Sequence, residues 1–124
     1  MEKRRGYYYG SLSEGKWWKR VWRAGLGVRG NGLCWSEKDA FYFRTYLIRV
    51  PIRIPFSSVE ELRVAGGLAG RRGGGAPSLR VSWFSPTGDR LVSGFRFGKT
   101  PEEFFDAVAE LFPGMALRRP REDD

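Results

Sequence analysis

The 124-residue sequence contains no histidine and a single cysteine, Cys34. Without histidine, neither a Ser-His-Asp triad nor a Cys-His dyad can form, and no zinc site can use imidazole ligands. A lone cysteine excludes a disulfide within the chain and is typical of a reducing compartment. No run of ~18 apolar residues is present, so we expect no membrane-spanning helix. These absences predict a cytoplasmic protein, either free or peripheral at the inner face of a membrane.

The charge of the chain is positive and unevenly placed. The formal net charge is +8 and the pI is about 10.1. Residues 1–30 hold 8 basic and 2 acidic side chains and residues 65–100 hold 6 and 1, whereas residues 101–124 hold 3 and 7. A basic field of this size suits an anionic partner such as a phosphate, a lipid headgroup or a nucleic acid. It suits solubility alone equally well.

Most of the chain has the hydrophobic pattern of strands. Apolar residues alternate with Arg49 and Arg53 over residues 48–54, which predicts a half-buried antiparallel strand, and Pro51 places that strand at an edge. A first strand is expected within residues 7–12 or 17–23. Further strands are expected at residues 32–35, 40–43, 59–64, 79–84 and 90–97. Turns are expected at residues 36–39 and 85–89. The glycine-rich residues 66–77 predict a loop.

A helix is predicted to begin after Thr100. This residue is a suitable N-cap, Pro101 fits the first helical position, and Glu103 completes a capping box. An apolar stripe at helical spacing follows, made of Phe104, Phe105, Val108, Leu111 and Phe112. Pro113 and Gly114 end the helix. The element order predicts a mainly β fold in which one C-terminal helix closes a curved antiparallel sheet, with a simple α+β sheet as the alternative.

Three segments support a resemblance to a known family. Residues 32–43 read GLCWSEKDAFYF, a strand, a polar turn and an aromatic strand, with Ser36 where the family commonly has Thr. Residues 52–59 read IRIPFSSV, and residues 91–112 hold the last strand and the closing helix. Together they resemble the pleckstrin-homology (PH)-like superfamily, in particular bacterial PH-like and GRAM-like domains. The resemblance covers about residues 30–112.

The resemblance implies a fold, a division of the chain and a class of function. The implied fold is a seven-stranded, antiparallel, partly open barrel capped by the C-terminal helix. We therefore expect a basic, Trp- and Tyr-rich segment at 1–29 that adds the first strand or a short helix, a PH-like core at 30–113, and a charged tail without fixed structure at 114–124. Family members bind phosphoinositides, other lipids, peptides or partner proteins, and the resemblance implies no catalysis.

The segment KWWKRVWR, residues 16–23, is the main candidate site. As a helix it would place tryptophans on one side and cations on the other, as in segments that lie in a membrane interface. As a strand its cation spacing loosely resembles the basic cluster of lipid-binding PH domains. In a purely structural interpretation the tryptophans pack into the core and the cations are solvated. The candidate anion- or lipid-binding residues here are Lys16, Lys19, Arg20 and Arg23, and the candidate membrane or partner contacts are Trp17, Trp18 and Trp22.

Two other basic segments are weaker candidates. Arg71 and Arg72, among the glycines of residues 66–75, could present guanidinium and backbone N–H groups to an anion, although a plain hairpin connection explains them as well. The N-terminal run of three basic and three tyrosine residues at 3–9 has the composition of a single-strand nucleic-acid site, but also of an edge strand.

The sequence therefore predicts a binding protein and not an enzyme. No acid–base dyad stands out among the carboxylates, Cys34 is expected to be an inert buried thiol, and we expect no catalytic residue, metal or cofactor. The predicted partner is an anionic lipid surface or a partner protein. The alternatives are protein recognition at an exposed sheet edge and nonspecific nucleic-acid binding.

Overall fold

The computed structural model describes residues 3–13, 16–20, 29–65 and 77–119, with only the backbone of residues 16–20. Within these ranges nine strands form one sheet and one α-helix follows them. The strands are β1 (Arg4–Ser13), β2 (Lys16–Arg20), β3 (Gly30–Glu37), β4 (Ala40–Thr45), β5 (Ile52–Pro55), β6 (Val59–Ala65), β7 (Ser78–Phe84), β8 (Arg90–Arg96) and β9 (Leu117–Arg118). The helix is α1 (Pro101–Leu111), and a short 3-10 turn, η2 (Phe56–Ser58), precedes β6.

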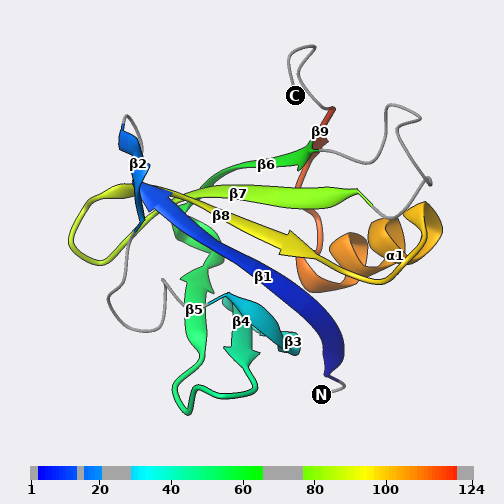
Figure 1. The fold of residues 1–124 in the computed structure, drawn as a ribbon. Coiled ribbons are helices and arrows are strands. Elements are labelled where there is room, and N and C mark those ends of the chain that lie inside the picture. Colours follow the sequence, from blue (N-terminus) through cyan, green and yellow to red (C-terminus); the bar gives the residue numbers. More distant parts are fainter. Residues whose placement is uncertain (1–2, 14–15, 21–28, 66–76, 120–124) are drawn as a thin grey trace.

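The first strand holds the two halves of the sheet together. The strand order is β5-β4-β3-β1-β8-β7-β6-β9, and β2 lies off this path, where its one partner among the described strands is β1. Figure 1 shows β1 crossing the molecule, with β3 to β5 on one side, β6 to β8 on the other and α1 at one end. The predicted mainly β fold with one C-terminal helix is confirmed.

The sheet differs from the predicted seven antiparallel strands at its far edge. Nine strands are present, and β9 runs parallel to β6, with Leu117 beside Leu62. This pair lies inside the segment 114–124 that we expected to lack fixed structure; residues 120–124 lie outside the described part. The chain turns at Gly114, where φ is 76°, and Leu117 then packs against the core. The Arg63 guanidinium also donates to the Arg119 carbonyl at 2.8 Å.

The strand predicted over residues 48–54 is wrong in its first half. Pairing with β4 begins only at Ile52, opposite Phe43, whereas the Ile48 N–H donates to the Thr45 carbonyl in a turn. Pro51 has no N–H to give to a strand ladder, so the alternation before it does not continue the sheet. Val50, expected to face inward, lies on the surface.

The N-terminal segment forms strands. The helical interpretation of residues 16–23 is wrong for 16–20, which form β2, while residues 21–23 lie outside the described part. β1 lies between β3 and β8, so the segment 1–29 supplies a central strand.

The core is a chain of aromatic rings that joins the sheet to α1. Phe41 stacks on Phe112 with 4.7 Å between ring centroids, and Phe97 stacks on Phe104 at 6.4 Å. The helix buries Phe104, Val108 and Leu111, as its stripe predicted, and also Ala107. Phe105 is an exception: it follows Phe104 by ~100° around the helix, which turns its ring toward solvent.

Two local features, one at the start of α1 and one within β1, follow from the residues at those positions. The predicted capping box is present at α1, with Thr100 and Glu103 each accepting from the other's backbone N–H. At Gly10, φ is 104° and the register with β8 shifts, so Tyr8 and Ser11 both face inward. Their hydroxyl groups bond to each other there.

Candidate anion-binding groove

A row of polar side chains crosses the outer face of the sheet at β1. Tyr7 pairs in register with Asn31 of β3 on one side and with Arg96 of β8 on the other. Residues in register share a face, and Tyr8 beside them is buried, so this row faces outward. Arg5 lies two residues along β1 and therefore on the same face. The row is thus built by sheet register from three separate parts of the chain.

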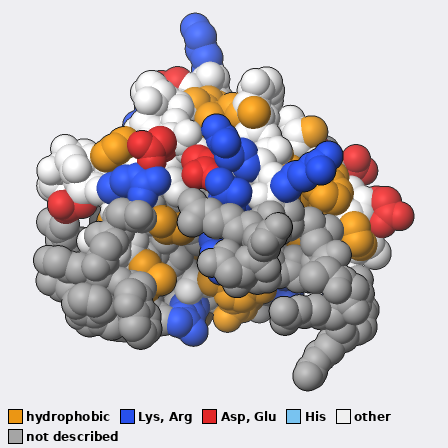
Figure 2. Space-filling model, turned by 90° about the horizontal axis from the view of Figure 1, so that it is seen from above, with side chains coloured by type: hydrophobic (Ala, Val, Ile, Leu, Met, Phe, Trp, Pro, Cys, Tyr) orange, Lys and Arg blue, Asp and Glu red, His pale blue; other side chains and the backbone are white. Residues whose placement is uncertain are grey.

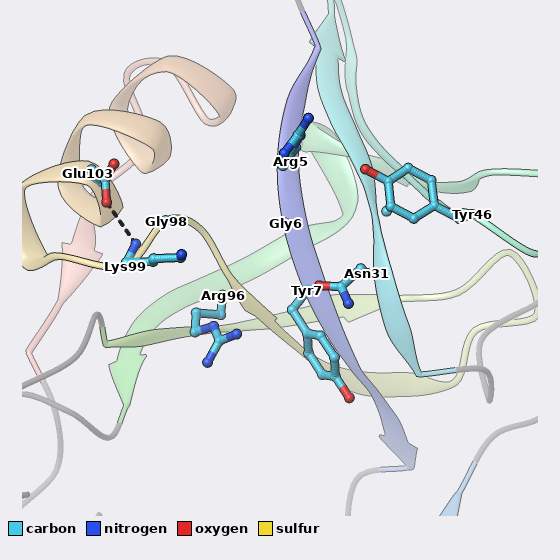
Figure 3. Close-up of a pocket in the computed structure, with 10 residues that line it drawn as sticks. Arg5, Gly6, Tyr7, Asn31, Tyr46, Arg96, Gly98, Lys99 and Glu103 are labelled. Atoms are coloured by element: carbon cyan, nitrogen blue, oxygen red, sulfur yellow. Dashed lines mark hydrogen bonds between the residues drawn. The ribbon is translucent and has the colours of Figure 1, made fainter. Parts of the chain in front are cut away.

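The link between β8 and α1 adds a further cation to this row. Gly98 has a φ of 80°, and a Cβ there would lie 2.5 Å from the Glu103 Cβ, so the turn requires glycine. This turn places Lys99 at the rim of the same hollow, where Figure 3 shows its side chain pointing from the link toward β1. On the opposite side of β1, the Tyr46 N–H donates to the Asn31 carbonyl at 3.1 Å and brings the Tyr46 ring alongside.

These side chains line a groove of about 630 Å³ that is open to solvent. We call it the β1 groove; its lining residues are Arg5, Gly6, Tyr7, Asn31, Gly32, Tyr46, Arg96, Gly98, Lys99 and Glu103. Its volume lies within the range of ~300–1,000 Å³ of small-ligand sites. Guanidinium, ammonium, amide and phenol groups donate hydrogen bonds from its walls. A ligand rich in acceptor oxygens and negative charge fits such walls.

Glu103 does not cancel this positive character. Among the described lining residues it is the one acidic side chain, and its carboxylate accepts from the Lys99 N–H at 2.8 Å and the Thr100 N–H at 3.1 Å. The bond from Lys99 N–H, together with those from Thr100, holds the pKa of Glu103 below its usual value. Glu103 therefore stays ionised, and the three cations Arg5, Arg96 and Lys99 outnumber it in the described lining. Within the groove, the Arg96 guanidinium lies over the Tyr7 ring, 5.7 Å from the ring centroid.

Basic and acidic side chains form ion pairs at other places on the described surface. On the face seen from above in Figure 2, acidic and basic side chains lie next to one another. Ion pairs of this kind occur along β6, where Glu61 bonds Arg63 and Glu60 bonds Arg90. The β1 groove is distinguished by cations gathered around a hollow.

The family model of the bacterial PH domain-like proteins matches residues 1–110. The chain belongs to this family. No curated protein and no solved structure matches it. The GRAM-like resemblance stays a prediction.

PH-like domains are generally non-catalytic binding modules. No group of three or more potential metal ligands occurs among the described residues. None of the described helices has the length and hydropathy that a membrane span requires. The match begins at residue 1 and therefore includes β1.

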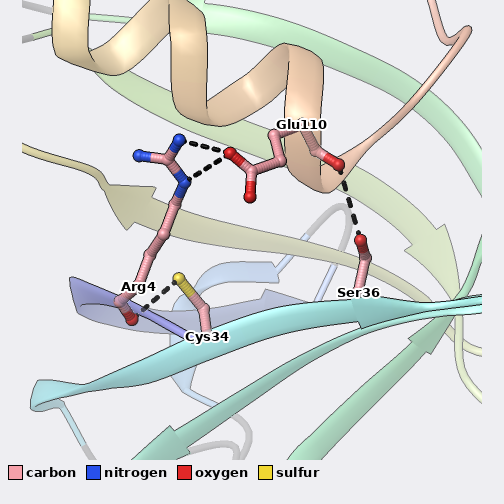
Figure 4. Close-up of polar contacts among 4 residues, drawn as sticks. All are labelled: Arg4, Cys34, Ser36 and Glu110. Atoms are coloured by element: carbon pink, nitrogen blue, oxygen red, sulfur yellow. Dashed lines mark hydrogen bonds and ion pairs between the residues drawn. The ribbon is translucent and has the colours of Figure 1, made fainter. Parts of the chain in front are cut away.

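A second polar cluster, shown in Figure 4, attaches the helix of the PH-like domain to the sheet. The Arg4 Nε donates to Glu110 at 3.0 Å, and this bond raises the pKa of Arg4. The Ser36 hydroxyl donates to the Glu110 carbonyl at 3.5 Å. Cys34, expected to be buried and inert, is fully buried with its thiol 3.5 Å from the Arg4 carbonyl, and burial raises its pKa to about 12. This cluster is structural.

The residues that the sequence singled out are only partly placed. Five of them belong to β2, whose side chains lie outside the described part: Lys16, Trp17, Trp18, Lys19 and Arg20. The others are outside it altogether: Trp22, Arg23, Arg71 and Arg72. Their proposed roles therefore stay predictions.

The groove itself was missed, although Arg5 and Tyr7 belonged to the N-terminal run considered for nucleic acid. Arg96 and Lys99 stand alone in the sequence, and Asn31 is an unremarkable polar residue. The available signal was parity: Arg5 and Tyr7 alternate with Gly6 and Tyr8, which assigns them to one face of a strand.

Proposed function

We propose that this PH-like domain binds an anionic membrane surface, with the phosphate of a lipid headgroup held in the β1 groove. The observation that supports the proposal is the gathering of Arg5, Arg96 and Lys99 around one hollow whose acidic residue, Glu103, is already bonded. Arginine and lysine recognise phosphate through charge-assisted hydrogen bonds. Each cation near an anionic bilayer contributes ~1 kcal/mol, so three give a reversible attraction.

The cations predicted earlier are proposed to add to this attraction. Six of them would strengthen the positive electrostatic potential of the protein: Lys16, Lys19, Arg20, Arg23, Arg71 and Arg72. Apolar contact with the membrane would come from Trp17, Trp18 or Trp22. A net charge of +8 is consistent with such a role. The proposal places the protein at the inner face of a membrane in the cytoplasm.

Co-sedimentation with lipid vesicles tests the proposal. We expect the protein to sediment with phosphatidylglycerol-containing vesicles and not with pure phosphatidylcholine. Arg5→Glu/Arg96→Glu replaces two groove cations, and binding should fall by roughly 100- to 1,000-fold, because two attractive charges are lost and two repulsive charges are added. The matched control is Arg118→Glu/Arg119→Glu, which makes the same change of net charge at exposed residues of β9 and just after it.

Three outcomes would contradict this function. Failure of the wild-type protein to bind anionic vesicles at low salt removes it. Equal losses in the two double variants would show that net charge alone attracts the protein. Preferential binding of a single-stranded oligonucleotide, weakening log-linearly with salt, would favour the nucleic-acid alternative.

Recognition of a partner protein by strand addition is the second candidate. β5 ends the strand order on one side and pairs only with β4 among the described strands. It is four residues long and ends at Pro55, so it offers a short ladder to an added strand. A partner bound in this way would show little salt dependence, which separates it from the membrane in the same assay.

A further inference from the structure

The loop between β4 and β5 exposes large apolar side chains at its tip. Leu47 is 91% exposed, Val50 is 65% exposed and Tyr46 is 49% exposed. We call these three residues the β4–β5 tip. They include the two most exposed large hydrophobic side chains of the described surface. A cluster of this kind costs free energy in water and commonly marks a contact surface.

The backbone of this loop is held in place, so the exposure is not that of a loose chain end. The Ile48 N–H donates to the Thr45 carbonyl at 2.9 Å, which closes a turn around Leu47. The Arg44 guanidinium donates to the Ile48 carbonyl at 3.4 Å, and Tyr46 bonds to β3 through Asn31. The tip therefore presents its apolar side chains in a preorganised loop, and ordering them on binding costs little.

The charge around the tip has one sign. Residues 40–59 contain no Asp or Glu and three arginines, at 44, 49 and 53. Arg53 is bonded to Asp39, whereas Arg49 lies exposed between Leu47 and Val50 in the sequence. Apolar side chains flanked by cations match the boundary between acyl chains and anionic headgroups, where arginine keeps its charge among the headgroups.

The tip is also continuous with the β1 groove. Tyr46 belongs to both, since its ring lines the groove and its neighbour Leu47 begins the exposed turn. Figure 3 shows Tyr46 on the β3 side of the groove, across β1 from Lys99. Tyrosine is enriched at the headgroup level of membranes, between the polar and apolar layers. A headgroup in the groove would thus lie beside the tip.

The small size of the tip favours a bilayer over a protein partner. A stable protein interface buries ~800 Å² on each side, with 20 or more residues, and three side chains on one turn fall far short of that. A bilayer takes in single side chains, and a few of them strengthen an electrostatic attraction. We infer that the β4–β5 tip inserts Leu47 and Val50 into the interface of an anionic bilayer while the β1 groove holds a headgroup. This inference rests on the proposed function.

A fluorophore on the tip tests the insertion directly. Cys34 is buried, so an environment-sensitive NBD label reacts selectively with a cysteine introduced by Leu47→Cys. On vesicles of phosphatidylglycerol and phosphatidylcholine, we expect its emission to shift to the blue and doxyl-labelled lipids to quench it. The control is the same label at Lys38→Cys, an exposed position in the turn before β4 and so at the other end of that strand from the tip. This label should stay in water.

The double variant Leu47→Ser/Val50→Ser gives an independent measure. Its vesicle binding should fall about tenfold or more, because two aliphatic side chains lose an apolar environment. The loss should persist at high salt, which screens the groove cations but not apolar contact. Phe105→Ser, which removes an exposed apolar side chain from α1, should bind as the wild type does.

The outcomes separate this inference from the function on which it rests. Vesicle binding by the wild type, with an unshifted label at position 47 and no loss in the double serine variant, overturns insertion and leaves the groove in place. An equal shift of both labels overturns it as well, since the tip would not be the contact. No vesicle binding at all removes the proposed function and the insertion together.

Discussion

Replacement of Ser93 by alanine should destabilise the fold far more than its size suggests. Ser93 is fully buried on β8, and its hydroxyl is the meeting point of a buried hydrogen-bond network. It accepts from the Trp83 indole N–H at 2.9 Å and bonds to the Ser11 hydroxyl, which in turn bonds to Tyr8. Burial, offset in part by these hydroxyl groups, raises the pKa of Tyr8 and keeps it neutral.

The magnitude follows from what Ser93→Ala leaves behind. The Trp83 N–H loses its partner in the core, which costs ~1–3 kcal/mol. Ser11 keeps Tyr8 but loses one bond, which costs about 0.5–1.5 kcal/mol. Together the free energy of unfolding should fall by roughly 2–4 kcal/mol, a large part of the ~5–15 kcal/mol of a domain.

Urea unfolding measures this loss, and Ser82→Ala is the matched control. Ser82 lies on neighbouring β7 between the buried Val81 and Trp83, so its side chain faces outward, and its removal should change stability by less than ~0.5 kcal/mol. With a slope of ~2 kcal/mol per molar urea, the midpoint of Ser93→Ala should drop by about 1–2 M at constant slope. If the midpoints of the two variants agree, the network does not stabilise the fold and our argument fails.

Two further predictions concern the helix cap and the thiol. Thr100→Ala should lower the free energy of unfolding by ~1 kcal/mol through loss of the N-cap. The stability difference between the wild type and Glu103→Ala should be complete at neutral pH and should vanish as the pH falls through the lowered pKa of Glu103, below its ordinary 4.5. Urea unfolding at pH 7 and pH 3 measures both effects, and a Glu103→Ala difference that grows in acid would contradict the capping box. Cys34, with a pKa of about 12, should resist Ellman's reagent at pH 8 in the folded protein and react fully above the urea midpoint, whereas rapid reaction of the native protein would show that the thiol is accessible.

Local sequence was sufficient where the decisive contacts are local. The alternation of Leu79, Val81 and Trp83 identified β7, whose partners on both sides are antiparallel. The capping box of α1 was predicted from Thr100 and Glu103, because both of its bonds lie within one turn. These features need no knowledge of distant residues.

The sequence did not predict features whose structure depends on residues far away in the chain. The alternation at Ile48 and Val50 is the same as that of a buried strand, but no strand of the described sheet pairs with it. The parallel pair at Leu117 depends on where the helix returns the chain to β6. The β1 groove needs the register of three strands, which brings Asn31 and Arg96 to either side of Tyr7. Pattern analysis assigns a residue to a face but does not tell which residues meet there.

The central position of β1 has a consequence for the order of folding. During synthesis β1 leaves the ribosome long before its partner β8, which ends at residue 96. Until then β1 has one of its two long edges unpaired, and closing the sheet requires a contact across most of the chain. Nascent chains that stall before β8 would expose an edge strand rich in tyrosine, which is a template for aggregation.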